Sequence, residues 1–186
     1  DTASTSGAVA LIKDDVLIAH TQLNIGLTHS ELLLPSIDHL MTITGMEMSA
    51  VDAIAITSGP GSFTGLRIGF STAKGMALGL GRPLIPIPTL DVLAQNGAGF
   101  DGLIVPIMNA RRQQVYTAVY RSDGHHISRV SDHQAIALAD LLSELQRMPE
   151  QLMVYMTGDG IEAFAEEAVD ALGERVVLAK GCRRYV

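Results

Sequence analysis

The sequence predicts an α/β protein made of two halves that share one order of elements. Hydrophobic residues make up 47% of the 186-residue chain, which is enough for a sizeable core. Short apolar runs of strand length alternate with longer segments of helical periodicity. Each half shows strands, a helix, a strand, a helix and a strand, and a glycine-rich stretch at residues 97–101 separates the halves.

The first half opens with a predicted hairpin. Two apolar strands, Gly7–Lys13 and Val16–Leu23, flank the turn at Asp14-Asp15. Thr28 followed by Glu31 forms a capping-box signature for a helix. One side of that helix carries apolar residues and a threonine: Leu33, Ile37, Leu40, Met41 and Thr44.

Pro35 lies early in this helical segment. Because proline removes a helix hydrogen bond, we expect the helix to begin near Leu33 or to kink. The rest of the half is predicted as a strand at Val51–Thr57, a loop at Ser58–Gly65, a helix at Leu66–Leu80, a strand at Leu84–Pro88 and a helix starting at Leu90–Gln95.

The second half follows the same order. Strands are predicted at Leu103–Met108, Val115–Arg121, His126–Val130, Leu152–Thr157 and Arg175–Leu178, and helices at Leu138–Arg147 and Ile161–Leu172. Two copies of βββαβαβ are the actin-like ATPase arrangement, a duplicated ribonuclease-H-like unit. We expect domains at residues 1–98 and 99–186, a first strand ahead of Asp1, and trimming at both ends.

The composition argues against several classes of protein. A net charge of -7 argues against a protein that binds nucleic acid by itself, since phosphate contacts need clustered Lys and Arg. The densest basic spots are Arg111-Arg112 and Arg183-Arg184. The single cysteine, Cys182, excludes a disulfide within the chain and fits a reducing cytosol. No apolar run reaches the ~18 residues of a membrane span, and no signal peptide is visible.

The segment Ser58–Gly69, SGPGSFTGLRIG, is the most informative loop. It fits neither the dinucleotide fingerprint, nor a Walker loop, nor the hydrolase elbow. Its glycines permit a tight strand-to-helix turn, and backbone amides at the following helix start could face an anion. Both interpretations stay open at this point.

The helix after this loop has two faces of small residues. Gly69, Ala73 and Ala77 form one, and Ser71, Gly75 and Gly79 form the other. Glycine costs about 1 kcal/mol per helical position relative to alanine, so packing must hold this helix. The partner is either the protein's own sheet or another subunit, with apolar contact from Leu66, Ile68, Met76 and Leu80.

Other polar residues offer weaker candidates for chemistry. Asp1 is either a turn residue or part of a vestigial nucleotide cleft. His125 and His126 are neighbours on a predicted strand and point to opposite faces, which disfavours a shared metal. His29 suits a cap or surface role, and His133 lacks a partner at useful spacing.

Several segments resemble the TsaB (YeaZ) family. They are the start from Asp1-Thr2 to Leu11, Thr28-His29-Ser30 with the following helix, the loop Ser58–Gly69, Arg82-Pro83-Leu84 with Thr89-Leu90-Asp91, and Pro106–Tyr116, where Asn109 stands in place of the usual Asp. The resemblance runs from Asp1 to about Tyr120 and then fades.

This resemblance implies a non-catalytic subunit in the synthesis of threonylcarbamoyladenosine (t6A37) in tRNA. Its partners would be the catalytic paralogue TsaD and a TsaE-like ATPase. The chain alone would form a homodimer, would contact tRNA only through the complex, and would be located in the cytoplasm. The implied interface comprises Leu33, Ile37, Leu40, Met41, Ile68, Gly69, Thr72, Ala73, Met76 and Leu80. The implied signature loop comprises Gly59, Pro60, Gly61, Ser62, Phe63, Thr64, Gly65 and Arg67.

The resemblance also implies that this chain lacks the metal site of TsaD. The positions of the two histidine ligands in that paralogue are occupied here by Thr89 and Leu93, which cannot replace imidazole. We therefore expect no metal, no tightly bound cofactor and at most a weakly held nucleotide in the complex. The alternatives are a stand-alone actin-like ATPase or kinase, and a metallopeptidase of the older glycoprotease-like label.

Overall fold

The computed structural model describes residues 1–25 and 28–186 and separates into two compact units, Asp1–Thr89 and Leu90–Val186. The division lies ahead of the boundary predicted at residue 98. The reason is helix α3 (Thr89–Ala94), whose Leu90, Leu93 and Ala94 are buried in the core of the second unit.

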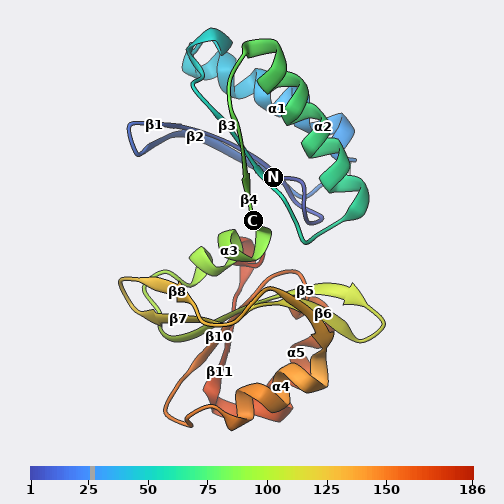
Figure 1. Ribbon diagram of the computed structural model, residues 1–186, viewed down its shortest axis with the longest axis vertical. Helices are drawn as coiled ribbons and strands as arrows, with labels where there is room; N and C mark the ends of the chain where they lie inside the picture. The colour runs from blue at the N-terminus through green and yellow to red at the C-terminus, as the bar shows by residue number, and fades with distance from the viewer. Residues whose placement is uncertain (26–27) are drawn as a thin grey trace. The chain divides into compact units, whose positions relative to one another are not determined.

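The first unit follows the predicted order of elements (Figure 1). Its strands and helices are β1 (Gly7–Lys13), β2 (Val16–Leu23), α1 (His29–Thr44), β3 (Ile54–Thr57), α2 (Phe63–Leu80) and β4 (Leu84–Ile87), with a 3-10 turn at Met48–Ala50. The hairpin bounds were predicted correctly. Asp14 and Asp15 both have positive φ, as a tight two-residue hairpin turn requires.

Helix α1 begins at His29, directly after the capping box, and contains Pro35. The backbone N–H of Thr28 donates to the Glu31 carboxylate at 2.9 Å. The predicted cap at Thr28 is therefore confirmed, and of the two alternatives for Pro35 the start near Leu33 was wrong, because the cap fixes the helix start despite the proline. Helix α2 also begins earlier than predicted, since Ser62 is its N-cap.

The strands of the first unit form two separate ladders. Strands β1 and β2 pair antiparallel, and β3 and β4 pair parallel. Helix α1 packs on the first ladder and on α2, and α2 packs on the second ladder. The buried apolar residues are Ala3, Leu33, Leu40, Met41, Ile56, Ala73 and Ala77.

The second unit contains one sheet and two long helices (Figure 1). Its elements are β5 (Asp101–Arg111), β6 (Gln114–Thr117), β7 (Tyr120–Asp123), β8 (Ile127–Arg129), β9 (Gln134–Ala137), α4 (Leu138–Arg147), β10 (Val154–Thr157), α5 (Ile161–Leu172) and β11 (Val176–Leu178). The predicted strand Val115–Arg121 is divided into β6 and β7, and β9 was not predicted.

Strand β5 is the centre of this sheet. Parallel β10 and then β11 lie on one edge. Antiparallel β7 and β6 share the other edge, and lead to β8 and β9 respectively. Residues 102–108 of β5 are all buried, as expected for a central strand.

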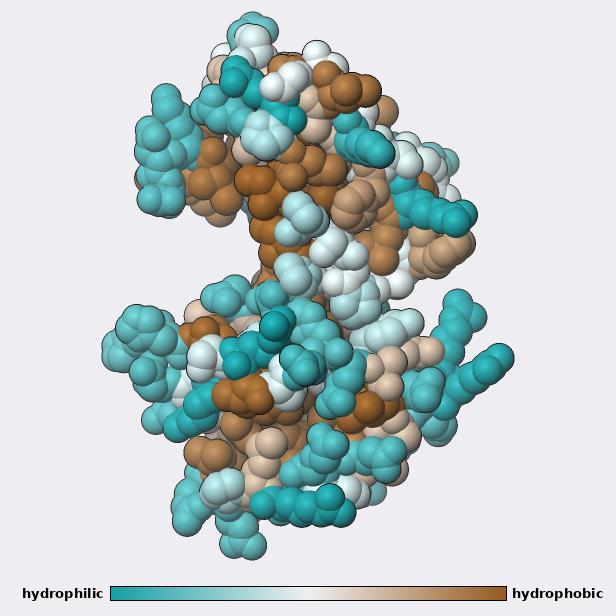
Figure 2. Space-filling view, in the orientation of Figure 1, coloured by the Kyte–Doolittle hydropathy of each residue, from teal (hydrophilic) through white to brown (hydrophobic). Residues whose placement is uncertain are grey.

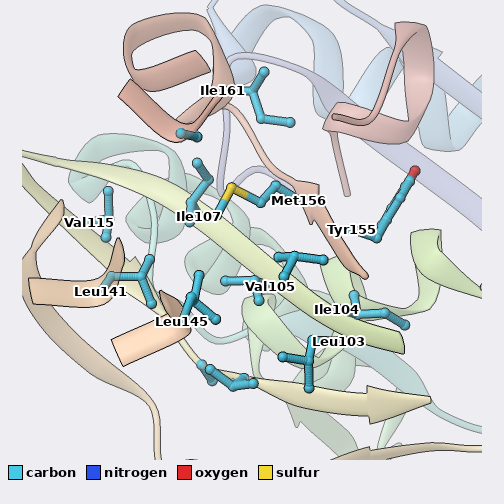
Figure 3. Packing of buried hydrophobic residues seen from close by; sticks show 14 of the residues in the cluster. Leu103, Ile104, Val105, Ile107, Val115, Leu141, Leu145, Tyr155, Met156 and Ile161 are labelled. Atoms are coloured by element: carbon cyan, nitrogen blue, oxygen red, sulfur yellow. The ribbon is translucent and has the colours of Figure 1, made fainter. Parts of the chain in front are cut away.

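The core of the second unit gathers around β5 (Figure 3). Ile104, Met156, Leu141 and Leu145 are fully buried in one continuous cluster. Burying each large aliphatic side chain contributes about 1.5–3 kcal/mol, so this cluster dominates the stability of the unit. Within the described residues, the chain has no helix long and apolar enough to cross a membrane.

Candidate functional site

The signature loop packs tightly on the segment that begins at Asp1. A Cβ added to Gly61 would lie 2.4 Å from the carbonyl oxygen of Ala3, and one added to Gly65 would lie 2.1 Å from that of Thr2. The Ser62 N–H donates to the Ala3 carbonyl at 2.7 Å, and the Ser62 hydroxyl accepts from the Gly65 N–H. These glycines are therefore explained by close backbone approach, and the loop is a tight strand-to-helix turn.

Two threonine hydroxyls form hydrogen bonds near the start of this loop. Thr57 donates its hydroxyl to Asp1 Oδ1 at 2.6 Å, and Thr89 accepts from the Gly59 N–H at 3.1 Å. Asp1 Oδ1 also accepts from the Ala3 N–H, which is the geometry of a turn aspartate. Asp1 Oδ2 is buried without a partner among the described residues.

The two small-residue faces of α2 have different surroundings. Gly69, Ala73 and Ala77 are buried inside the first unit, and a Cβ on Gly69 would meet the Thr2 hydroxyl at 2.2 Å. Gly75 and Gly79 are exposed, and a Cβ on either would meet nothing within 4 Å. Packing within the unit therefore explains the first face and leaves the second unexplained.

The predicted interface residues divide by burial. Half of them are buried in the first unit: Leu33, Leu40, Met41, Gly69 and Ala73. The others are half-buried: Ile37, Ile68, Thr72, Met76 and Leu80. The interface stays a prediction, but the buried five can contribute only by supporting the helices from within.

The exposed surface of the same helices carries large apolar side chains that the prediction did not include. Leu34 and Ile43 of α1 are exposed, as are Phe63 and Leu78 of α2, and Leu78 reaches 83%. Figure 2 shows hydrophobic residues gathered on one face of the first unit. The available signal was that Leu34 and Ile43 of α1 lie off the apolar side chosen from its helical spacing, so the helix has apolar residues on more than one face.

Arg67 belongs to the first exposed turns of α2. Its guanidinium lies 4.0 Å from the centroid of the Phe63 ring, a cation–π contact. An exposed contact of this kind contributes about 0.5–1 kcal/mol. It holds a cation and an aromatic ring, both members of the signature loop, together on the surface of the first unit.

Thr89 and Leu93, at the expected metal-ligand positions, have structural roles. Thr89 is fully buried and bonded to Gly59, and Leu93 is part of the core of the second unit. Over residues 1–25 and 28–186, no three His, Cys, Asp or Glu side chains are grouped to hold a metal ion.

A polar cluster in the second unit was missed by sequence reasoning. Asp91 Oδ1 accepts from the Tyr120 hydroxyl at 2.6 Å, lies 2.9 Å from His133 Nε2, and is 3.5 Å from an Arg129 nitrogen. Burial acts to raise the pKa of Asp91, but the hydrogen bonds from Tyr120 and His133 and the nearby positive charges outweigh it, so the pKa is lowered. The expectation that His133 lacks a partner was wrong.

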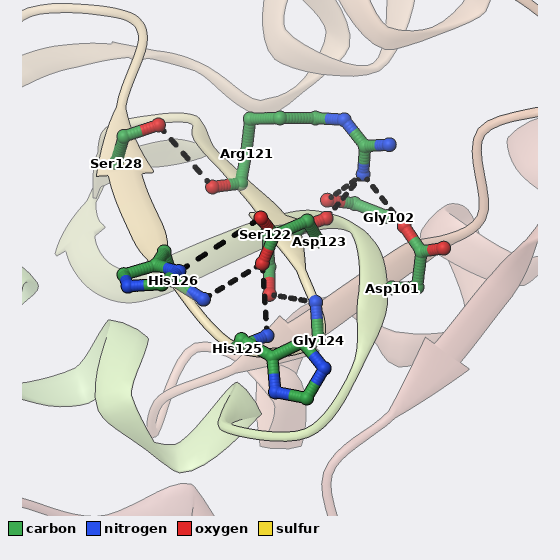
Figure 4. A network of polar contacts seen from close by, with 9 residues as sticks. All are labelled: Asp101, Gly102, Arg121, Ser122, Asp123, Gly124, His125, His126 and Ser128. Atoms are coloured by element: carbon green, nitrogen blue, oxygen red, sulfur yellow. Dashed lines mark hydrogen bonds and ion pairs between the residues drawn. The ribbon is translucent and has the colours of Figure 1, made fainter.

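Two other histidine predictions can be compared with the structure. His125 and His126 lie in the turn after β7, where both backbone N–H groups donate to Asp123 Oδ1 (Figure 4). This turn is built by the aspartate and not by the imidazoles. His29 is half-buried, with Nε2 2.8 Å from the Ser4 carbonyl oxygen, so its role is internal and not at the surface.

The chain is similar in sequence to proteins of one tRNA-modification pathway. A family model described as TsaD, tRNA N6-adenosine threonylcarbamoyltransferase, matches residues 25–179. The Bacillus subtilis protein named tRNA threonylcarbamoyladenosine biosynthesis protein TsaB is 37% identical over 94% of this chain and 76% of its own length. The Escherichia coli protein of the same name is 32% identical over 85% of this chain and 69% of its own length.

A solved structure supports the same fold. The crystal structure of an uncharacterized Pseudomonas aeruginosa protein with similarity to peptidase YeaZ superposes with a TM-score of 0.78. It is 24% identical and covers 97% of this chain and 81% of that one, which establishes a shared mixed α/β fold. On the family match and these relatives, the chain belongs to the TsaB (YeaZ) family of tRNA threonylcarbamoyladenosine biosynthesis proteins, within the sequence family described by the TsaD model.

Proposed function

We propose that this chain is a non-catalytic subunit that binds and activates the tRNA N6-adenosine threonylcarbamoyltransferase of the same pathway. Family membership supports the pathway. Thr89 and Leu93, each with a structural role, support the absence of metal chemistry in this chain. The net charge of -7 supports tRNA contact through another subunit.

The observation that carries the proposal is the open face of α2. Ser71, Gly75 and Gly79 are exposed, and the two glycines have no neighbour within 4 Å of an added Cβ. Each costs the helix about 1 kcal/mol relative to alanine without any compensating contact inside the unit. Close approach of a partner's backbone would explain both glycines.

Apolar side chains beside this face would supply the contact energy. Leu78 of α2 and Ile43 of α1 are exposed. At the start of α2, the Arg67 guanidinium lies over the Phe63 ring. Aromatic and arginine side chains are enriched at interface hot spots. A TsaE-like ATPase as third component, a homodimer of the isolated chain and a duplicated actin-like origin of the two units belong to the same proposal.

Replacing Gly75 by Arg tests the docking face. Arginine is a better helix former than glycine, so the free energy of unfolding should stay the same or rise by up to about 1 kcal/mol. The added side chain would block backbone approach, and we expect co-purification with the transferase to weaken at least 100-fold. The measurement is a pull-down of the tagged chain with the purified transferase, with urea unfolding of each variant.

Ala139→Arg is the matched control, because Ala139 is an exposed position of α4 in the second unit. It should leave the association unchanged. Ala73→Arg is unsuitable, since Ala73 is buried and the change would unfold the first unit. Full retention of binding by Gly75→Arg would exclude this face as the interface.

A further inference from the structure

Three polar side chains meet at one imidazole nitrogen in the second unit. His133 Nε2 lies 2.9 Å from Asp91 Oδ1, 3.0 Å from Arg129 Nη1 and 3.1 Å from the Tyr120 hydroxyl oxygen. These neighbours come from α3, from the end of β8 and from β7, which lie in the same unit (Figure 1). Within residues 1–25 and 28–186, they are the charged or titratable groups that contact this imidazole.

The hydrogen-bonding roles of these neighbours are fixed by their chemistry. A guanidinium only donates hydrogen bonds, and an ionised carboxylate only accepts them. Although burial acts to raise the pKa of Asp91, its hydrogen bonds lower it, so the carboxylate is ionised at neutral pH. Burial and the Asp91 carboxylate raise the pKa of Tyr120, whose hydroxyl therefore keeps its hydrogen and donates it to Asp91 at 2.6 Å.

One ring nitrogen cannot satisfy Asp91 and Arg129 at the same time. Nε2 carries either a hydrogen or a lone pair. With a hydrogen, it donates to Asp91 but faces the N–H of Arg129 at 3.0 Å. With a lone pair, it accepts from Arg129 but faces the Asp91 oxygen at 2.9 Å. The two contacts therefore belong to two different states of His133.

Protonation selects between these two states. In the imidazolium ion both ring nitrogens carry hydrogen, so Nε2 can only donate. The neutral ring can place its hydrogen on Nδ1, which leaves Nε2 free to accept from Arg129. Because Arg129 is exposed, its guanidinium can move into water without leaving a buried charge unpaired.

The backbone around the imidazole is fixed by other bonds. The N–H groups of Val130 and Ser131 both donate to the Val119 carbonyl, and the Val119 N–H donates to the Ser131 hydroxyl at 2.8 Å. Strand β9 begins directly after His133. A change of partners at the imidazole is therefore confined to side chains.

We propose that His133 is a pH-sensitive switch that holds Arg129 when neutral and releases it when protonated. In the neutral state the Nε2 lone pair accepts from Arg129. In the protonated state Nε2–H donates to Asp91, and the Arg129 guanidinium turns to solvent. Acidification thus adds one positive charge to this surface of the second unit and frees a guanidinium group. This inference concerns the chain alone and goes beyond the proposed function.

Nitrogen NMR of the full chain tests the switch at pH 8 and pH 5, on either side of the range in which histidines usually titrate. At pH 8 we expect His133 to carry its hydrogen on Nδ1 and Arg129 to be ordered. At pH 5 both ring nitrogens should be protonated, and the heteronuclear Overhauser effect at Arg129 Nε should fall about twofold. Arg175 is the internal reference, because its guanidinium bonds to backbone carbonyl oxygens, which do not titrate.

His133→Asn is the matched variant, since an amide does not titrate in this range. Arg129 should then respond to pH no more than Arg175 does. His125→Asn is the control, because His125 is an exposed histidine of the same unit, and it should leave the Arg129 response as in wild type.

Three results would overturn the proposal. They are a hydrogen on His133 Nε2 at pH 8, an Arg129 signal that does not change with pH in the wild type, and a pH response that persists in His133→Asn. None of these measurements involves the transferase, so the switch and the proposed function fail separately.

Discussion

The second unit buries its apolar residues far more completely than the first. Its sheet is continuous around β5, and one cluster of buried side chains extends from Leu90 to Ala179. The first unit has two separate ladders and a short set of buried apolar residues. It also holds most of the exposed large apolar side chains among the described residues, including Ile12, Leu17 and Leu78.

The connection between sheet and helix does not explain this difference, because both units build it in the same way. In the first unit the Ser62 N–H bonds to the Ala3 carbonyl, and in the second the Gly160 N–H bonds to the Ile107 carbonyl. In each unit, a Cβ added to a neighbouring glycine would collide with that carbonyl oxygen. The distance would be 2.4 Å from Gly61 to Ala3 and 2.8 Å from Gly160 to Ile107. What differs among the described strands is their pairing: β5 joins the parallel and antiparallel pairs of the second unit into one sheet, whereas the first unit has two separate ladders.

The largest expected effect comes from opening a cavity in each core. Leu145→Ala should lower the free energy of unfolding of the second unit by about 3–4 kcal/mol, since Leu145 is fully buried in the large cluster. Leu40→Ala in the first unit should cost about 2 kcal/mol, because fewer buried neighbours surround the cavity and the site can relax. Urea-dependent hydrogen exchange measures each unit separately.

Leu34→Ala is the control for Leu40, since Leu34 lies on the same helix and is exposed. It should change stability by less than about 0.5 kcal/mol. If Leu40→Ala cost as much as Leu145→Ala, the first unit would be as well packed as the second, and the comparison would fail.

Local signals predicted most of the fold. The hairpin β1–β2 and helices α4 and α5 were predicted with correct bounds, because apolar periodicity and turn residues are local properties. The capping box identified the start of α1 correctly, and only the alternative start near Leu33 was wrong, because the helix runs from its cap through Pro35. The division into β6 and β7 was missed because it depends on contacts with Ser131 and β5, which are not local.

The candidate site was less predictable for a related reason. The spacing of Gly69, Ala73 and Ala77 identified a face of α2, but sequence alone could not show that this face packs inward. The cluster at Asp91 joins residues up to 42 positions apart, so no window of sequence contains it. Only tertiary structure determines which of several apolar or polar faces stays exposed.

The smallest expected effect concerns that cluster. Tyr120→Phe removes the 2.6 Å hydrogen bond to Asp91 and should cost the second unit about 1 kcal/mol at neutral pH. Tyr116→Phe is the control, because the Tyr116 hydroxyl has no hydrogen-bond partner among the described residues. Since the pKa of Asp91 is lowered in the folded state, its contribution is present above pH 4 and is lost as the pH falls through that lowered value.

The difference between wild type and Tyr120→Phe should therefore shrink in acid, whereas Tyr116→Phe should stay near wild type throughout. Urea unfolding monitored by hydrogen exchange in β7, from pH 7 to pH 3, would measure both. A constant difference across this range would mean that the Tyr120 hydroxyl stabilises the unit without the Asp91 charge. In that case the cluster would be a neutral hydrogen-bond network, and the acid sensitivity of the second unit would have to come from other carboxylates.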